Sequence, residues 1–338
     1  MKFDAEKKQS IIIYLLEKIS ENSKSLSKVV SDTLSISQNT VHTYLNELLE
    51  KGIIHKGKRG QYKLVSKNFR YTLRRSKGEL DSDIHVYNTC LRDHVAMFPE
   101  NVQDIWSYAF SEMVNNVMDH SEAETLEIAI TQNFLRTQVL IVDNGIGIFE
   151  KIKSHFLLSS LDEAICELFK GKLTTDESNH SGEGIFFTSK MMDAFLIVSS
   201  GKVFAASRDS NDSIIDDIDE ALPGTGVAMS LSNYTHKSAR EVFDSYSNVD
   251  GAFYKTRIPI KNIFDSAPVS RSQAKRVCNR LEKFQEVILD FDEVSWMGQG
   301  FAHQLFVIFN NLHPEIKLIP INMNEGVTNM YSHVINSI

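Results

Sequence analysis

The sequence predicts a multidomain α/β protein, and three observations lead to that prediction. The chain has 338 residues, enough for two or three domains. Residues 1–80 carry 16 Lys and Arg against 8 Asp and Glu, a net charge of +8, and the whole chain carries −8, which leaves −16 on the rest. The last third alternates strand-like with helix-like segments, as in a small sheet covered by helices. We therefore expect domains at residues 1–78, 79–235 and 250–338.

Composition narrows the class of protein further. An apolar content of 42% with 24% charged residues is ordinary for a soluble chain. No apolar run approaches the roughly 18 residues of a membrane span, and the first residues lack the apolar core of a signal peptide. Cys90, Cys166 and Cys278 are odd in number and far apart, which favours reduced thiols. We expect a cytoplasmic protein with no membrane partner.

The basic first domain has the pattern of a nucleic-acid-binding module. Residues 10–19 and 26–34 have amphipathic helical patterns, and residues 35–37 form a turn before a third helix at 38–51. Residues 52–65 then give two short strands around a basic glycine turn. This order resembles a winged helix-turn-helix domain. The stretch 66–77 either extends the basic surface or connects the domains.

The resemblance to winged-helix domains implies DNA as a partner. The third helix would enter the major groove, where Gln and Asn can read adenine, and the hairpin cations would touch phosphates. The candidate DNA-binding residues are Gln38, Asn39, Thr40 and Thr43 on the helix and Lys56, Lys58 and Arg59 on the hairpin. A protein-docking or dimerising module is the alternative, because Ser, Gln and Asn are also ordinary helix caps. A homodimer on two half-sites is compatible with either reading.

The middle of the chain carries four short motifs in a fixed order. They are Glu112-Met-Val-Asn-Asn116, Asp143-Asn-Gly145-Ile-Gly147, Ser181-Gly182-Glu-Gly184 and Gly224-Thr225-Gly226. Glu112 and Asn116 are spaced i and i+4, so they share one face of a helix that Pro99 opens. Magnesium takes oxygen ligands and keeps several waters, so the carboxamide of Asn116 is enough to hold it beside phosphates. Glu112 would then orient or deprotonate the attacking water.

The three glycine motifs supply the remaining parts of a nucleotide site. Asp143 follows the apolar strand 138–142, where a carboxylate can accept from the exocyclic amine of a purine. Gly145 and Gly147 provide backbone freedom at that turn. Gly182 and Gly184 lead directly into a helix, whose free amides bind phosphate. Gly224, Thr225 and Gly226 complete the phosphate or base pocket ahead of the strand 227–231.

These four motifs resemble the ATP-binding domain of the GHKL superfamily, which includes gyrase B, the histidine kinases, MutL and the anti-sigma-factor serine kinases. The resemblance covers roughly residues 85–232 and implies an α/β sandwich, the Bergerat fold, that binds ATP with Mg²⁺. Glu112 and Asn116 match the N-box, and the glycine motifs match the three glycine boxes. The segment 149–180 then corresponds to the ATP lid, where Lys172, Thr174 and His180 face phosphates or solvent. The alternative is a structural helix followed by three tight turns.

The C-terminal third contains strands at 253–260, 286–291 and 316–322 and helices at 270–284, 300–312 and 327–335. The run Leu289–Gly300 resembles the phosphoacceptor turn of STAS domains, the anti-sigma-factor antagonists. Those antagonists have Asp-Ser-Ser where this chain has Gly298-Gln299-Gly300, which removes the hydroxyl that would be phosphorylated. Ser295 lies nearby, and Ser270 and Ser272 open the preceding helix. We expect this domain to dock a protein or to sense nucleotide.

Two functions follow from these resemblances. The first is a cytoplasmic DNA-binding regulator whose GHKL core binds Mg·ATP, with or without hydrolysis. Lid closure would change how that core packs on the STAS-like domain and so alter binding of DNA or a partner by the winged helix. The second is a protein serine/threonine kinase of the anti-sigma type that phosphorylates a separate partner. A module whose ATP is purely structural is a third reading. All three retain Asn116.

Overall fold

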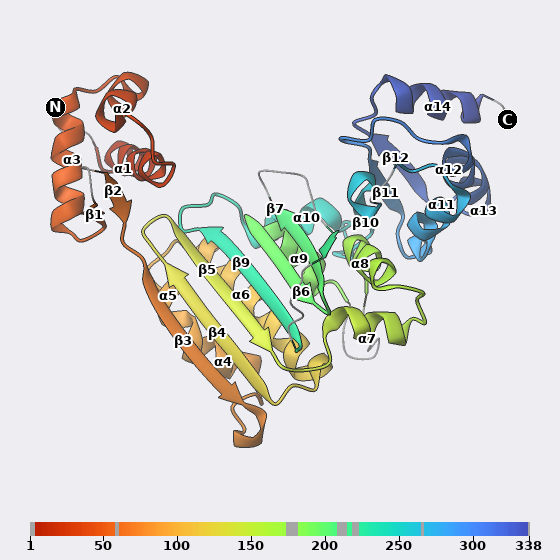
Figure 1. Ribbon diagram of the computed structural model, residues 1–338, viewed down its shortest axis with the longest axis horizontal. Helices are drawn as coiled ribbons and strands as arrows, with labels where there is room; N and C mark the ends of the chain where they lie inside the picture. Colours follow the sequence, from red (N-terminus) through yellow and green to blue (C-terminus); the bar gives the residue numbers. More distant parts are fainter. Residues whose placement is uncertain are drawn as a thin grey trace. The chain divides into compact units, whose positions relative to one another are not determined.

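The computed structural model describes residues 4–57, 61–173, 182–207, 215–217, 223–264 and 267–336 (Figure 1). Within these ranges the chain divides into two compact units. The first comprises Met1–Arg70 with Ala129–Val139 and Ser230–Thr235, and the second comprises Tyr71–Ile128, Leu140–Met229 and His236–Ile338. None of the described helices combines the length and the apolarity needed to cross a membrane.

The first unit opens with three helices and an antiparallel hairpin. These elements are α1 (Ala5–Ser20), α2 (Leu26–Leu34), α3 (Gln38–Glu50), β1 (Ile54–Lys56) and β2 (Tyr62–Leu64). Asp4 caps α1 by accepting from the backbone N–H of Lys7, and Ser37 caps α3 by accepting from that of Thr40. The predicted helices and strands of residues 10–65 are therefore present.

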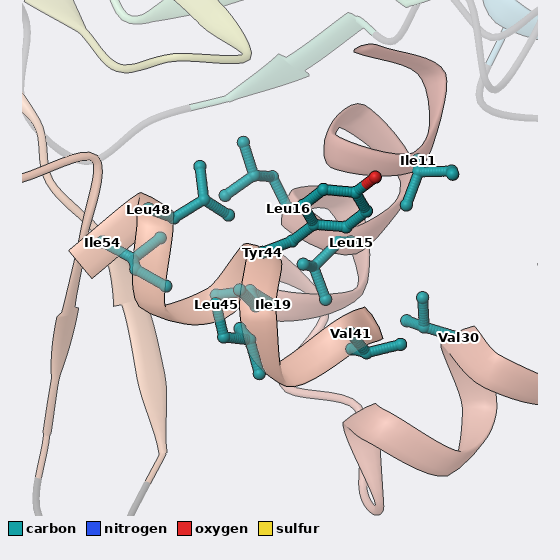
Figure 2. Close-up of a cluster of buried hydrophobic side chains, with 10 residues drawn as sticks. All are labelled: Ile11, Leu15, Leu16, Ile19, Val30, Val41, Tyr44, Leu45, Leu48 and Ile54. Atoms are coloured by element: carbon teal, nitrogen blue, oxygen red, sulfur yellow. The ribbon is translucent and has the colours of Figure 1, made fainter. Parts of the chain in front are cut away.

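The core of this three-helix segment is apolar and well defined (Figure 2). Positions three and four apart along α1 and α3 bring one face of each helix into it. Its buried side chains are Ile11, Leu15, Leu16, Ile19, Val30, Val41, Tyr44, Leu45, Leu48 and Ile54. The partly buried Phe134 and Leu135, which belong to the same unit, pack against this cluster.

A seven-stranded sheet follows, with strand order β3-β4-β5-β9-β6-β7-β8. Its strands are β3 (Lys67–Arg74), β4 (Thr125–Gln132), β5 (Arg136–Asp143), β6 (Ala194–Ser199), β7 (Lys202–Ser207), β8 (Ile215–Asp217) and β9 (Thr225–Ser232). β3 is an edge strand, so most of the basic stretch 66–77 is part of the sheet and not a connector. Its Lys67, Arg70 and Arg74 are exposed, as expected of a basic surface. β4 and β5 alternate buried with exposed residues along their length. At β4 and β5 one face of the sheet is therefore covered and the other is open to solvent, whereas β9 is buried along nearly its whole length.

Helices from several parts of the chain cover that face (Figure 1). They are α4 (Asp83–Cys90), α5 (Arg92–Val95), α6 (Glu100–Asn116), the π-helical turn η3 (Val117–Ser121), α9 (Gly184–Met191) and α10 (Ala239–Tyr246). Two further helices, α7 (Ile148–His155) and α8 (Leu161–Lys170), lie beyond the end of the sheet (Figure 1), and α8 contacts β10. The 3-10 turn η2 (Arg75–Lys77) links β3 to α4. α6 begins after Pro99 as predicted, and its buried face includes Trp106, Phe110 and Met113. This packing fixes the face on which Glu112 and Asn116 lie.

The C-terminal part is a three-stranded parallel sheet with helices around it. Its elements are β10 (Lys255–Pro259), η4 (Ile260–Ile263), α11 (Arg271–Cys278), η5 (Leu281–Lys283), β11 (Glu286–Asp290), α12 (Gln299–Ala302), η6 (His303–Phe309), α13 (Asn310–Leu312), β12 (Lys317–Ile321) and α14 (Glu325–Ile335). The strand order is β10-β11-β12. The helix predicted at 270–284 is wrong in length, because the chain leaves the helix at Asn279 and Arg280 adopts a φ of 58°.

The three cysteines are buried free thiols, as their spacing predicted. Burial raises the pKa of Cys90, Cys166 and Cys278 to about 12 in each case. These side chains are therefore protonated core residues.

Candidate functional site

The end of α6 presents both predicted polar residues to one cavity. Glu112 and Asn116 are half-buried, while their neighbours Met113 and Val114 are packed in the core. Beyond Asn116 the helix widens into η3, which ends at Glu122 with a left-handed φ of 57°. This irregular end brings His120 and Ser121 to the same cavity.

Asp143 lies at the end of β5 and is only 3% exposed. Its Oδ1 accepts from the backbone N–H of Gly145 at 2.8 Å, and the backbone of Thr225 also donates to the carboxylate. Burial raises the pKa of Asp143, while these two hydrogen bonds oppose that rise. The structure therefore holds a buried hydrogen-bond acceptor in the wall of the cavity at the end of β5.

Two glycines let the backbone come very close to this carboxylate. A Cβ on Gly145 would lie 2.0 Å from the Ser121 carbonyl oxygen, and one on Gly224 would lie 2.3 Å from that of Asp143. Thr225 is buried beside them, and its Oγ1 accepts from the backbone N–H of Ile148 at 3.0 Å. The first and third glycine motifs therefore pack against one another, although about eighty residues separate them.

The second glycine motif meets the carboxylate of Glu112. A Cβ on Gly184, the first residue of α9, would lie only 2.0 Å from Glu112 Oε2. Gly182 has a φ of 71°, and its carbonyl oxygen accepts from the backbone N–H of Leu173 at 3.0 Å. The N-terminus of α9 therefore faces the carboxylate of Glu112.

A cavity of about 260 Å³ unites these groups. Seven of the predicted residues line it: Glu112, Asn116, Asp143, Gly147, Gly182, Gly184 and Thr225. Gly145 and Gly224 support Asp143 from behind without lining the cavity, and Gly226 lies in β9 beyond Thr225. Apolar side chains such as Ile141, Ile197 and Leu168 form the remaining walls. A cleft that combines apolar walls with convergent polar groups is typical of a ligand site.

Two polar residues of this region were missed by sequence reasoning. Lys151 lines the cavity, and its ammonium donates to the carbonyl of His120 at 2.5 Å. The sequence feature that could have identified Lys151 is its position one helical turn after Gly147, in the first half of α7. Tyr108 lies one turn before Glu112, and its pKa is raised by burial and by the negative charges of Glu112 and Glu183. The i, i+4 spacing from Glu112 could have identified it.

Lys172 does not take either of its predicted positions. Its ammonium donates to the carbonyl of Lys283 at 2.8 Å and lies over the rings of Phe253 and Phe284. It faces the C-terminal part of the chain instead of a phosphate or open solvent. Thr174, His180 and Ser181 lie outside the described residues.

The oxygen donors of this cavity suit a metal ion that binds together with a phosphate-bearing ligand. Among the described residues, no three His, Cys, Asp or Glu side chains are grouped so as to hold a metal ion alone. Mg²⁺ bound to phosphates needs only one or two protein oxygens and keeps its waters. The carboxamide of Asn116, on the same cavity wall as Glu112, is compatible with that requirement.

Five of the seven predicted DNA-binding residues are among the described residues. Gln38, Asn39, Thr43 and Lys56 are exposed, whereas Thr40 is half-buried. Two hydroxyls are already engaged, because Thr40 Oγ1 bonds Ser37 Oγ and Thr43 Oγ1 donates to the carbonyl of Asn39. Lys58 and Arg59 lie outside the described residues.

A basic groove lies between α3, the hairpin and the loop that follows α1. Its volume is about 650 Å³. Gln38, His42 and Lys56 line one part of it, and Lys18, Lys24 and Lys28 line another. The lysines of the α1–α2 region were not predicted as DNA contacts, although their number in so short a stretch is a signal of an anion-binding face.

The C-terminal sheet carries its own polar cluster at the carboxyl end of its strands. Asp290, 2% exposed, pairs with the guanidinium of Arg257 and accepts from Asn322 Nδ2 at 2.8 Å. The turn Gly298–Gly300 follows, and Gly298 cannot hold a side chain because a Cβ would meet the Val269 carbonyl at 2.7 Å. Ser270 is committed to capping α11 through a reciprocal bond with Gln273.

Residues 273–328 match the family described as a STAS-like domain of unknown function (DUF4325). The C-terminal part of the chain therefore contains a STAS-like domain, and the matched residues fall inside the predicted range 250–338. They include the parallel strands β11 and β12 and the turn with Gly298. No curated protein matches the chain.

Proposed function

We propose that this protein is an ATP-binding regulatory protein whose middle domain has the GHKL fold and binds Mg·ATP. One observation carries the proposal. Four segments spread along the chain contribute to a single cavity, and each brings the polar group or the glycine that a nucleotide site requires. A structural helix with three turns gives no reason for Glu112, Asn116 and Asp143 to converge.

Each group has a task that follows from its position. Asp143 accepts from the purine amine, and Thr225 supports it from the neighbouring strand. The N-terminus of α9 receives the phosphates in place of the Glu112 carboxylate, since helix N-termini favour anions. Bound Mg²⁺ would neutralise phosphate charge, with Asn116 as its protein ligand. Glu112 holds a water or hydroxyl in line with the terminal phosphate and accepts its proton.

The test follows γ-labelled Mg·ATP with the full chain, scoring free phosphate and protein-bound label separately. Glu112→Ala should reduce turnover about 100-fold or more while leaving binding measurable, because general-base catalysis contributes on that scale. Asn116→Ala should weaken Mg-dependent binding. Asn115→Ala is the matched control, since Asn115 is on the same turn of α6 but does not line the cavity. A wild type that binds no nucleotide would overturn the proposal.

A protein serine/threonine kinase of the anti-sigma type is the second candidate. Glu112 could accept a proton from a hydroxyl as well as from water, and a STAS-like domain is part of the same chain. The turn Gly298–Gly300 offers no hydroxyl, so the acceptor would be a separate protein. Label transferred to an added protein partner, in place of free phosphate, would favour this reading.

We propose in addition that the first domain is a winged helix-turn-helix that binds DNA. The supporting observation is the basic groove that adjoins Gln38 and Lys56. Phosphate contacts by lysine release counterions, so affinity should fall steeply with salt. Anisotropy titrations of labelled duplexes at several salt concentrations test this. Affinity that does not change with salt would refute it.

A further inference from the structure

One segment of the second unit borders both the nucleotide cavity and the C-terminal STAS-like domain. α8 and the three residues after it contribute Leu168, Gly171 and Leu173 to the cavity wall. The opposite side of the same segment is buried against β10 and α11. A change in the position of this segment therefore alters both the cavity and the docking of the C-terminal domain.

Lys170 fastens α8 to the C-terminal domain. Its side chain is 1% exposed, and its ammonium donates to three acceptors. These are Glu167 Oε1 at 2.8 Å, the Arg276 carbonyl at 2.9 Å and the Asn279 carbonyl at 2.7 Å. All three ammonium hydrogens are satisfied, and two of their acceptors lie at the end of α11. Lys170 thus completes the C-terminus of a helix in the neighbouring domain.

Glu167 and Lys172 strengthen the same contact. Glu167 accepts from Asn279 Nδ2 at 3.1 Å, and its other oxygen lies 3.5 Å from Arg280 Nε. Lys172 donates to the Lys283 carbonyl, and its own carbonyl accepts from Arg280 at 3.5 Å. Undocking would expose a buried ion pair and leave the carbonyls of α11 without their donor. The segment is therefore held in one discrete position.

In this docked position the cavity is small for a nucleotide triphosphate. Its volume of about 260 Å³ is below the roughly 300–1,000 Å³ of most ligand sites. Leu173 closes one side through its backbone bond to Gly182, and the Glu112 carboxylate lies against Gly184 at the α9 N-terminus. Phosphates entering there must displace Glu112 and move the segment that carries Leu173.

We propose that the STAS-like domain is a built-in clamp that lowers the affinity of the cavity for nucleotide by holding α8 and residues 171–173 in place. This inference rests on the proposed nucleotide function and gives that function a regulator. Because coupling between two sites is reciprocal, bound nucleotide must loosen the docking of the STAS-like domain by the same factor. A partner that binds the end of α11 in place of Lys170 would likewise raise nucleotide affinity.

The test uses the full chain and a fluorescent ATP analogue with Mg²⁺. The double variant Glu167→Gln, Lys170→Met removes both buried charges together, so neither is left unpaired. Lys172→Ala weakens the clamp at a half-buried position. It serves as a second variant because a change there should disturb folding less than a change in the buried pair. Lys275→Met is the matched control, because Lys275 is an exposed lysine of α11 that directly precedes Arg276 in the sequence. Both clamp variants should bind at least about 5-fold more tightly, the lower end of ordinary allosteric coupling, with the control unchanged.

Hydrogen exchange gives a second readout in the wild type. Saturating Mg·ATP analogue should speed amide exchange at residues 279–284 and 171–173 while slowing it at the N-terminus of α9. Equal affinity in the wild type and both clamp variants, or weaker affinity in the variants, would overturn the clamp and leave nucleotide binding intact. Absence of binding in every protein would overturn the proposed function and the clamp with it.

Discussion

At the scale of single residues, the second glycine motif matters because it lies against Glu112. Gly184 has no space for a side chain, since its Cβ would fall 2.0 Å from a carboxylate oxygen. That oxygen is the far end of a flexible side chain, so Glu112 can move while the fold is kept. The contact therefore concerns the geometry of the site more than the stability of the protein.

Gly184→Ala should accordingly uncouple function from folding. We expect nucleotide turnover to fall about 10-fold or more, because small misplacements of catalytic groups are costly, with little change in melting temperature. Gly300→Ala is the matched control, since its Cβ meets nothing closer than 3.4 Å at the start of a helix. Turnover assays and thermal denaturation of both variants test this prediction. An unaltered turnover in Gly184→Ala would argue against Glu112 as the general base.

Asp143 should give nucleotide binding a pH dependence of its own. Burial raises its pKa above the ordinary 3.8, so the folded protein holds this proton more tightly than the unfolded chain. Its contribution to ligand-free stability is therefore present at low pH and lost as pH rises through the raised pKa. Binding of the purine amine has the opposite sign, because the ionised carboxylate is the better acceptor.

We expect nucleotide affinity to weaken about 10-fold as pH falls through the raised pKa of Asp143, the scale of one hydrogen bond to a charged group. Titrations across a pH series measure it. Asp143→Asn should bind weakly at every pH with a flatter profile. A profile of the same steepness in the variant would assign the titration to another group.

At the scale of elements, α8 is unusual because it buries an ion pair. The Glu167 and Lys170 side chains are 4% and 1% exposed. Removing Lys170 leaves Glu167 with the guanidinium of Arg280, 3.5 Å away, as its remaining counter-charge, whereas replacing both members of a buried pair is often nearly neutral. Lys170→Met alone should thus destabilise the protein by about 3–5 kcal/mol. The double variant with Glu167→Gln should recover only part of that loss, because the Arg276 and Asn279 carbonyls still lack their donor. Denaturant unfolding followed by tryptophan fluorescence measures both. Equal losses would contradict the assignment.

In the proposed DNA complex, α3 should read the base sequence, whereas the hairpin should contact phosphates. Lys56→Ala should weaken binding of all duplexes similarly and lower the salt slope by about 1. Gln38→Ala should instead reduce discrimination among sequences, by about 1–3 kcal/mol at one base pair. Lys51→Ala, at the far end of α3 and outside the groove, is the control. Identical effects of the Lys56 and Gln38 variants would refute this division of roles.

Elements were the most predictable level of this protein. The amphipathic spacing of residues 10–51 and the caps Asp4 and Ser37 determine helices locally, and the structure has them. The prediction failed where tertiary contacts override local pattern. The basic stretch 66–77 became mostly an edge strand of the sheet, and the helix predicted at 270–284 ends at Cys278, where Lys170 caps it.

For the whole molecule, ligand binding should stabilise one part of the chain selectively. A ligand that binds only the folded state adds about 2.7 kcal/mol at a concentration of 100 times its Kd. We expect Mg·ATP to slow hydrogen exchange around residues 112–116, 143–148 and 225–231, with no change in α1, α2 and α3. Protection confined to the three helices would overturn the assignment of the nucleotide site.

The sequence by itself determined the chemistry available to this protein. The i and i+4 spacing of Glu112 and Asn116 and the glycine motifs with Asp143 and Thr225 are local patterns, because neighbouring residues along the chain set them. Only the tertiary structure decided that these motifs share one cavity, that Lys151 and Tyr108 lie beside them, and that Lys170 and Lys172 face the STAS-like domain. Those facts depend on which elements pack together, and packing joins residues that no local pattern connects.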